Sequence, residues 1–293
     1  MKILDGKKIS QDIKDELKML VSNRLKKGFK KPHLAAIIVG NDGASLTYVG
    51  SKVKACDYVG YDSTLIKLEE SITEEFLLEK INNLNNNPHI DGFIVQLPLP
   101  RGIDEQKILL AIDPYKDVDG FHPTNFGRMS LEMESFIPAT PYGIIELLDR
   151  YEIETSGKDC VVIGRSNIVG RPISILLSQK SKKGNATVTL AHSKTKNLKS
   201  ITKNADIIIS ALGIPGFLKS DMVKKGVVII DVGITRVPDQ SSSKGYVIKG
   251  DVDYQNVLEK SSAITPVPGG VGPMTIACLL NNTVECFKKS LAK

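Results

Sequence analysis

The chain has 293 residues, of which 41% are hydrophobic and 25% charged, and its formal net charge is +6. This length and apolar content allow a large buried core, and typical domain sizes predict about two domains. With no tryptophan and only 5% aromatic residues, the chain offers no stacking platform for nucleic acid, so its positive charge suits small anionic ligands.

The N-terminus and the cysteines predict the compartment. Met1–Ser10 carries too many charges for a secretory signal, and no apolar run reaches the roughly 18 residues of a membrane span. The four cysteines form no CxxC pair and have no histidine partner at metal-ligand spacing, which indicates reduced, buried thiols. We therefore predict a cytoplasmic protein with no membrane partner and no bound metal.

Short β-branched runs alternate with helical segments along the chain, which predicts an α/β fold. Runs with apolar residues on both faces are typical of parallel strands covered by helices. The expected strands are Leu34–Val39, Thr64–Leu68, Gly92–Leu97, Cys160–Ile163, Thr187–Leu190, Asp206–Ser210 and Val227–Val232. A further short strand, Tyr246–Gly250, is expected near the edge of a sheet.

The segment Asp113–Pro141 interrupts this alternation with prolines and turn residues, so we place the junction of two α/β domains there. The first predicted domain covers residues 1–138 together with the last helix, 273–293, which follows the Pro/Gly-rich stretch VPGGVGPM. The second domain covers residues 139–272. We expect the last helix to pack back on the first domain and a catalytic cleft to lie between the two.

A helix is predicted from Ala44 to Val59, with Asn41–Gly43 as capping residues and Gly60 as its stop. Tyr48 and Lys52 are four residues apart and therefore project from the same face of this helix. Such a pair can stack on a flat ligand and move or stabilise a proton. On spacing alone, a partly buried tyrosine beside a lysine that reaches to solvent is the more common arrangement, so the spacing leaves both interpretations open.

Two later segments carry further candidate polar residues. Gln96 lies near the carboxyl end of a predicted parallel strand, where α/β sheets bind ligands. Asp117 and Asp119 lie on a loop in the predicted domain junction. No third oxygen ligand follows them at regular spacing, so a turn or a hydrogen-bonding carboxylate is a better interpretation than a metal site.

The stretch Cys160–Pro172 is typical of a dinucleotide-binding turn: an apolar strand enters a glycine turn, and a helix follows from near Ile168. Gly164 allows the sharp turn, but Ser166 stands where the usual GxGxxG pattern has its second glycine, and Gly170 comes four residues later. In a dinucleotide site, the following helix would direct its unpaired N–H groups at the phosphates. The alternative interpretation is an ordinary tight strand-to-helix turn.

The next strand favours NADP over NAD. A site selective for NAD usually has a carboxylate at the end of the second strand to bind the ribose hydroxyl, whereas this chain has His192, Ser193 and Lys194 there. Arg165 and Arg171 add guanidinium groups that suit a phosphate.

The motifs TYVGSK, GFIVQLPLP, KDVDGFHP, GRSNIVGRP, DVGI and TPVPGGVGPMT occur in this order along the chain. In them the chain closely resembles, over essentially its whole length, the bifunctional methylenetetrahydrofolate dehydrogenase/methenyltetrahydrofolate cyclohydrolase (FolD) family. The resemblance implies a Rossmann-type NADP-binding domain after a folate-binding catalytic domain. It also implies a homodimer that acts in one-carbon metabolism, in tetrahydrofolate interconversion and purine biosynthesis.

The resemblance also implies residue roles. Lys52 is the catalytic lysine of the cyclohydrolase, Tyr48 orients the folate and Gln96 tunes the lysine. Asp119 hydrogen-bonds the pterin ring, and Asp117 receives no catalytic role. The implied cofactor contacts are Gly164, Arg165, Ser166, Ser193 and Ile234, to which Arg171 is added for its guanidinium group. The implied substrate contacts are Tyr48, Lys52, Gln96, Leu97, Asp119, Pro268, Gly269 and Gly270.

The chemistry fits these residues. The implied activity is NADP-dependent oxidation of 5,10-methylenetetrahydrofolate to the methenyl form, followed by hydrolysis to 10-formyltetrahydrofolate. Hydride leaves a carbon whose positive charge is shared by two nitrogens, so only the hydrolysis needs proton transfer, and Lys52 serves it as a base or as a cation. A monofunctional dehydrogenase and a non-catalytic NADP-sensing or nucleic-acid-binding protein are the alternatives. Polyglutamylated folates are a further expected substrate, because lysines attract their tails.

Overall fold

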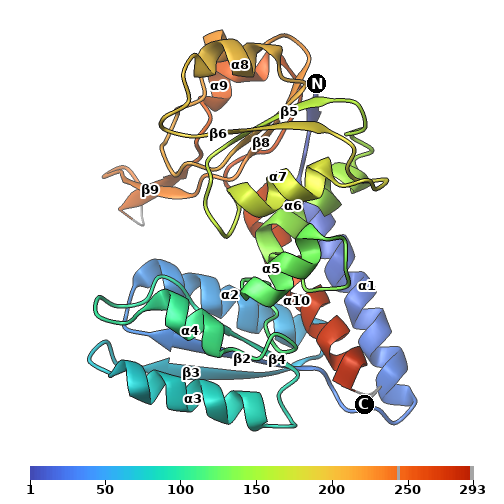
Figure 1. Cartoon of the computed structure of the whole chain (residues 1–293), viewed down its shortest axis with the longest axis vertical. Helices are drawn as coiled ribbons and strands as arrows, with labels where there is room; N and C mark the ends of the chain where they lie inside the picture. Colours follow the sequence, from blue (N-terminus) through green and yellow to red (C-terminus); the bar gives the residue numbers. More distant parts are fainter. Residues whose placement is uncertain (243–244, 291–293) are drawn as a thin grey trace. The chain divides into compact units, whose positions relative to one another are not determined.

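The computed structural model describes residues 1–242 and 245–290, which form two compact α/β units (Figure 1). The first unit contains Gln11–Ala139 and the described residues from Ile276 onward, and the second contains Met1–Ser10 and Thr140–Thr275. The sequence analysis assigns residues 1–10 to the first domain, whereas here they group with the second unit. The reason is that β1 (Lys2–Ile3) pairs in parallel with β11 (Ser261–Ile264), two strands that the sequence analysis does not predict.

The first unit is built on a three-stranded parallel sheet with the order β3–β2–β4, formed by Asp62–Leu68, His33–Val39 and Gly92–Val95. Side chains on one face of β2 pack against α3 (Glu74–Asn86) and α4 (Glu105–Ala111) in one apolar cluster. Helix α2 (Gly43–Val59) packs against β2 and β3 (Figure 1). Leu34–Val39 is buried along its whole length because helices cover the strand on both faces.

Three further helices belong wholly or partly to this unit. Helix α5 covers Pro123–Ser130. Helices α1 (Gly6–Lys26) and α10 (Val271–Ser290) each begin in the second unit and continue into the first. None of the helices that the structure describes is long and apolar enough to cross a membrane.

Helix α2 begins and ends as its sequence predicts. The Asp42 carboxylate accepts a hydrogen bond of 2.7 Å from the Ser45 N–H at the N-terminus. At the other end Gly60 has φ 84°, a left-handed conformation that favours glycine, and its N–H donates to the carbonyls of Cys56 and Asp57. Both ends of the helix are therefore fixed, and with them the direction in which its functional face points.

The second unit contains a six-stranded parallel sheet with the order β1–β11–β8–β7–β5–β6. Besides β1 and β11, its strands are β5 (Asp159–Ile163), β6 (Thr187–Ala191), β7 (Ile207–Ser210) and β8 (Val227–Asp231). Its helices are α6 (Ala139–Arg150), α7 (Gly170–Ser178), α8 (Leu198–Asn204) and α9 (Tyr254–Leu258), with a 3-10 turn at Ser220–Met222. All seven strands predicted from the main apolar runs are present across the two units, and the α/β fold class is confirmed.

The strand order creates a switch point in the second unit. The chain passes from β5 outward to β6 and then crosses back to β7 on the other side of β5. Ligands bind α/β sheets at the carboxyl ends of strands where the order reverses in this way. The predicted strand near Tyr246 is also present, as β10 (Tyr246–Lys249), but it pairs with β9 (Thr235–Pro238) in a separate antiparallel ribbon.

Candidate functional site

The predicted lysine of the first unit lies inside the protein. Lys52 is only 4% exposed, and its Nζ donates a hydrogen bond of 3.3 Å to Gln96 Oε1. The same Nζ lies 4.8 Å from the centre of the Tyr48 ring, within the range of a cation–π interaction. The structure therefore brings together three predicted residues from α2 and the end of β4, and the interpretation of Lys52 as a solvent-reaching lysine is wrong.

The orientation of Gln96 is fixed from two sides. Its backbone N–H donates to Ile37 O at 2.8 Å, which extends the sheet one residue beyond the end of β4. Its side-chain Nε2 donates to Leu97 O at 2.8 Å. Because the nitrogen of the amide is committed to Leu97, the oxygen faces Lys52.

The two aspartates of the predicted acidic loop have different roles. Asp117 is 1% exposed, and its carboxylate accepts from the N–H groups of Gly120, Phe121 and His122 at 3.1, 3.3 and 2.8 Å. It also accepts from Asn125 Nδ2 at 2.9 Å. Asp117 therefore shapes the loop that presents the partly buried Asp119.

A residue that the sequence analysis does not identify binds the backbone of this loop. Asn282 on α10 is 4% exposed, and its Nδ2 donates to Val118 O and to Ile137 O, both at 2.9 Å. The Ala139 N–H donates to Asp119 O at 3.3 Å, which ties the loop to the same segment. A buried amide in a largely apolar helix is the signal that would have pointed to Asn282, because such a group needs partners.

Burial sets the protonation states around Lys52. It lowers the pKa of Lys52, while the negative charge of Asp119 acts to raise it. Burial also raises the pKa of Asp119, against the effect of Lys52. The pKa of Cys56 rises to about 12, again through burial, so its thiol stays neutral. The site thus holds one amine that is able to exchange a proton closer to neutral pH than an ordinary lysine does.

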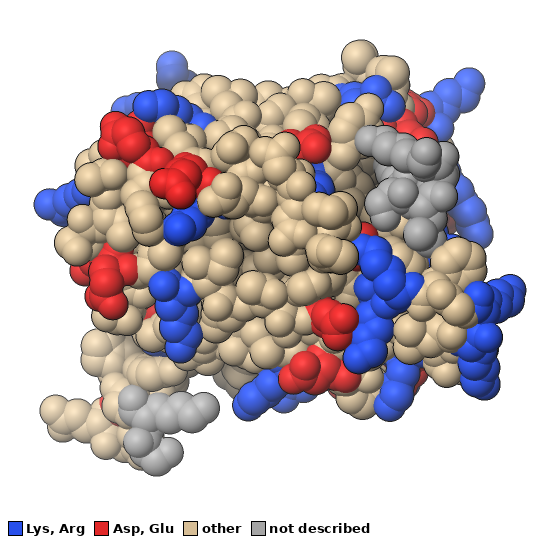
Figure 2. Space-filling model, turned by 90° about the horizontal axis from the view of Figure 1, so that it is seen from below, with Lys and Arg blue, Asp and Glu red and all other residues tan. Residues whose placement is uncertain are grey.

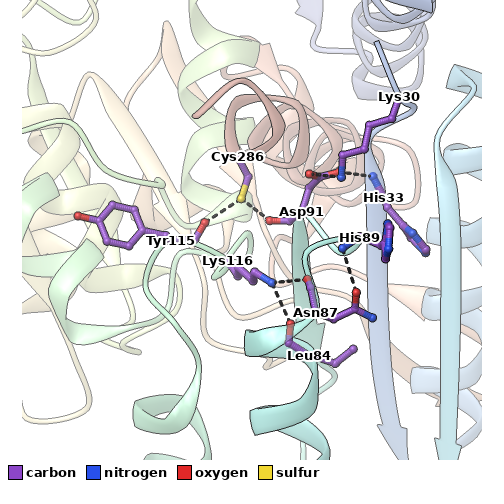
Figure 3. Close-up of polar contacts among 9 residues, drawn as sticks. All are labelled: Lys30, His33, Leu84, Asn87, His89, Asp91, Tyr115, Lys116 and Cys286. Atoms are coloured by element: carbon purple, nitrogen blue, oxygen red, sulfur yellow. Dashed lines mark hydrogen bonds and ion pairs between the residues drawn. The ribbon is translucent and has the colours of Figure 1, made fainter. Parts of the chain in front are cut away.

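A second polar network lies at the opposite end of β4 from Gln96. The Asp91 carboxylate, just before β4, accepts from Lys30 Nζ and from the His33 N–H, both at 2.8 Å (Figure 3). The Cys286 thiol of α10 contacts the backbone oxygens of Asp91 and Tyr115. This network anchors the amino end of β4, whereas Gln96 follows its carboxyl end.

The predicted nucleotide turn lies at the switch point of the second unit. Gly164 has φ 117°, and a Cβ atom there would lie 2.2 Å from Ala211 O in the loop after β7. A Cβ at Gly170 would lie 2.0 Å from Gly164 O. Both positions therefore require glycine, and α7 begins at Gly170, two residues later than expected.

Ser166 replaces the second glycine of the usual pattern with a capping function. Its Oγ accepts from the N–H groups of Val169 and Gly170 at 3.2 and 3.3 Å, the N-cap and the first residue of α7. Around this turn Arg165, Arg171 and Ser193 are exposed, and Lys194 is exposed beside Ser193. Exposed cations without a carboxylate at the end of β6 fit the additional phosphate of NADP.

The remaining predicted contacts also belong to the second unit. Ile234 follows β8 and is 64% exposed. Pro268–Gly270 lies before α10, where Gly269 O accepts from the Lys7 N–H at 3.0 Å. The proposed contact of this loop with folate stays a prediction. Among the residues that the structure describes, no group of three His, Cys, Asp or Glu side chains is able to hold a metal ion.

Comparisons with known proteins match both parts of the chain. Residues 4–119 match the family model "Tetrahydrofolate dehydrogenase/cyclohydrolase, catalytic domain", and residues 138–291 match the NAD(P)-binding domain of the same family. The chain is 68% identical to the bifunctional protein FolD of Flavobacterium johnsoniae over 100% of this chain and 99% of that protein.

Two solved structures resemble the whole chain. The bifunctional FolD enzyme from Campylobacter jejuni is 50% identical, with a TM-score of 0.92 over 99% of each chain. The Trypanosoma brucei methylenetetrahydrofolate dehydrogenase-cyclohydrolase, solved with NADP cofactor and an inhibitor, is 37% identical. Its TM-score is 0.93, over 99% of this chain and 98% of that one.

Proposed function

Because the chain belongs to the tetrahydrofolate dehydrogenase/cyclohydrolase family and has both of its activities, we propose that Lys52 performs the proton transfers of the cyclohydrolase step. The enzyme oxidises 5,10-methylenetetrahydrofolate with NADP and hydrolyses the methenyl product to 10-formyltetrahydrofolate. The observation that carries the proposal is the buried Lys52 amine bonded to Gln96. We assign folate binding and catalysis to the domain of residues 1–138 and 273–293, and NADP binding to residues 139–272.

The hydride step requires the protein only to bind and orient the folate substrate and NADP. Hydride leaves the carbon between N5 and N10, and the positive charge that forms spreads over both nitrogens, so no residue has to remove a proton. NADP, when bound, supplies the hydride acceptor. In our proposal the Gly164–Ser166 turn and Arg171 bind its phosphates, Ser193 contacts the ribose side, and Ile234 contacts the cofactor from the end of β8.

The hydrolysis step needs a base and a proton donor. Water oxygen bonds to the methenyl carbon and neutral Lys52 takes one of its two protons, which leaves a hydroxyl group on that carbon. The bond from that carbon to N5 then breaks, N5 takes the proton from the Lys52 ammonium group, and the hydroxyl loses its remaining proton to solvent, which leaves the formyl group on N10. Tyr48 holds the folate ring, Gln96 holds the Lys52 amine and Asp119 hydrogen-bonds the pterin. Pro268, Gly269, Gly270 and the Leu97 backbone complete the proposed folate contacts.

A pH profile of Asp119→Asn tests the role of Lys52. The Asp119 charge acts to raise the pKa of Lys52, so its removal lowers that pKa further. If neutral Lys52 is the base, cyclohydrolase kcat increases with pH through this titration, and the rising limb moves to lower pH in the variant. The measurement is kcat for methenyltetrahydrofolate against pH, with the uncatalysed rate subtracted.

The matched control for this profile is Asp57→Asn, which removes an exposed carboxylate from the same helix as Lys52. We expect the rising limb of its pH profile to lie at the same pH as in the unmodified enzyme. A limb that stays in place in Asp119→Asn, or a rate that falls as Lys52 loses its proton, would contradict the assignment of neutral Lys52 as the base.

We further propose that the chain forms a homodimer in the cytoplasm. The family resemblance supports the dimer, and light scattering on the purified protein tests it. The four cysteines are buried and form no disulfide, which supports a reducing compartment.

We also propose that polyglutamylated folates bind better than monoglutamates at low salt. The chain has a net charge of +6, and on the face seen in Figure 2 basic side chains are interspersed with acidic ones and form no continuous basic stripe. Coulomb attraction to a polyglutamate tail lowers KM, and salt screens it within a Debye length of about 10 Å at 0.1 M. Equal KM values for both substrates at low salt would disprove this preference.

A further inference from the structure

Two buried aspartates lie at the carboxyl end of the sheet in the second unit. Asp231 is the last residue of β8 and 2% exposed, and Asp251 follows β10 and is completely buried at 0%. Burying a carboxylate is costly unless hydrogen bonds compensate for the lost water. Both aspartates obtain these bonds from backbone N–H groups of the surrounding loops, and those loops are the ones beside the switch point.

Asp251 fixes the loop that follows β7. Its Oδ2 accepts from the N–H groups of Leu212 and Gly213 at 2.6 and 3.2 Å, and its Oδ1 accepts from the Ile214 N–H at 2.9 Å. One carboxylate therefore binds three consecutive amides. The loop begins at Ala211, the residue whose carbonyl approaches Gly164 so closely that only glycine fits there.

Asp231 fixes Asp251 in turn. Its Oδ1 accepts from the N–H groups of Asp251 and Gly233 at 2.8 and 2.9 Å, and its Oδ2 accepts from the Val252 N–H at 3.0 Å. A Cβ at Gly250 would lie 1.9 Å from Asp231 Oδ2, and one at Gly233 would lie 2.4 Å from Asp251 Oδ1. The pair is thus tightly enclosed, and it connects the backbone just before Ile234 to the loop of Leu212–Ile214.

The topology shows which part of the cofactor meets these loops. In the proposed NADP site the end of β6, with Ser193, takes the adenosine side, and the Gly164 turn takes the pyrophosphate. The other half of the dinucleotide then extends across the switch point to the ends of β7 and β8. There Ile214 and Ile234 are 50% and 64% exposed and offer apolar surface to a flat ring.

We propose that Asp251, supported by Asp231, is a positioning residue for the nicotinamide half of NADP; this inference rests on the proposed NADP site. Asp251 does not touch the cofactor but holds the two loops that face it. Because it acts on one half of the dinucleotide, its loss affects NADP and an adenosine-half ligand differently.

The test compares NADP with 2′,5′-ADP, which contains only the adenosine half. In Asp251→Asn an NH2 group replaces one acceptor oxygen and faces backbone N–H donors, so the loop of Leu212–Ile214 has to move. We expect the Kd for NADP, measured by calorimetry, to rise about tenfold or more, and the Kd for 2′,5′-ADP to stay unchanged. Cyclohydrolase activity, which uses no NADP, should also persist.

Two further variants make the result decisive. Asp221→Asn changes an exposed carboxylate of the same unit that pairs with Lys199, and both ligands should bind it as they bind the unmodified enzyme. Arg165→Ser should weaken both ligands together; if it weakens neither, the proposed NADP site is wrong, whatever Asp251→Asn does.

The positioning role itself is overturned if Asp251→Asn binds NADP normally, or if it loses NADP and 2′,5′-ADP equally. If Asp251→Asn fails to fold, the same test uses Asp231→Asn, because that variant keeps the three acceptor contacts of Asp251. The difference between its effects on the Kd for NADP and the Kd for 2′,5′-ADP should be smaller. If a thermal melt shows that neither variant folds, the pair serves the sheet as a whole and the proposal falls.

Discussion

Lys52→Met is expected to lower cyclohydrolase kcat by about 10²–10⁴-fold, the range that a positioned general base contributes, and to leave the dehydrogenase working. Hydrolysis requires a group that takes a proton from water, whereas hydride transfer removes no proton. Methionine resembles lysine in length and suits the buried position, where Lys52 is 4% exposed. The measurement is a paired assay: NADP reduction with methylenetetrahydrofolate, and loss of methenyltetrahydrofolate alone.

Lys54→Met is the matched control, because Lys54 lies on the same helix but is exposed. Both activities should survive in it. Lys52→Met should fold at least as stably as the unmodified enzyme, because it removes a charge that burial disfavours. A folded Lys52→Met enzyme with full cyclohydrolase activity would show that Lys52 is not the base.

The sequence predicts those strands whose signal is local. Five of the seven main strands are runs of apolar residues that are buried on both faces, as in Leu34–Val39. The other two, β3 and β6, are edge strands that are partly exposed but still rich in β-branched and apolar residues. Strand β1 has only two residues, Lys2–Ile3, and β11 begins with two serines, so neither carries that pattern. They become strands through pairing with each other and with β8, which are contacts between distant parts of the chain.

The site residues also divide into those with a local sequence signal and those defined by contacts between distant parts of the chain. Tyr48 and Lys52 share one helix, so their spacing alone puts them on one face, although it does not tell whether Lys52 is buried. Burial follows from Gln96 and the acidic loop, which reach the lysine only after folding. Asn282 and Asp251 act on backbone groups far away in the chain, 164 residues in the bond from Asn282 to Val118, and no local pattern announces such partners.

Gly164→Ala should have the opposite effect to Lys52→Met, since it should abolish NADP binding and dehydrogenase activity and spare the cyclohydrolase. Gly164 has φ 117°, where a side chain is strained, and the added Cβ would lie 2.2 Å from Ala211 O. The turn has to open, which displaces the phosphate site; a displacement of about 1 Å is enough to cost about 10²-fold in rate.

Gly157→Ala separates this effect from backbone strain alone. Gly157 also has a positive φ, 70°, in the same unit, but its Cβ would meet no atom within 4 Å. It should therefore lose some stability in a thermal melt while its Kd for NADP stays unchanged. If Gly164→Ala binds NADP as tightly as Gly157→Ala does, the turn is an ordinary strand-to-helix connection and the cofactor phosphates bind elsewhere. If only Gly164→Ala loses NADP, the contact between Gly164 and Ala211 defines the phosphate site, and the two activities depend on different parts of the chain.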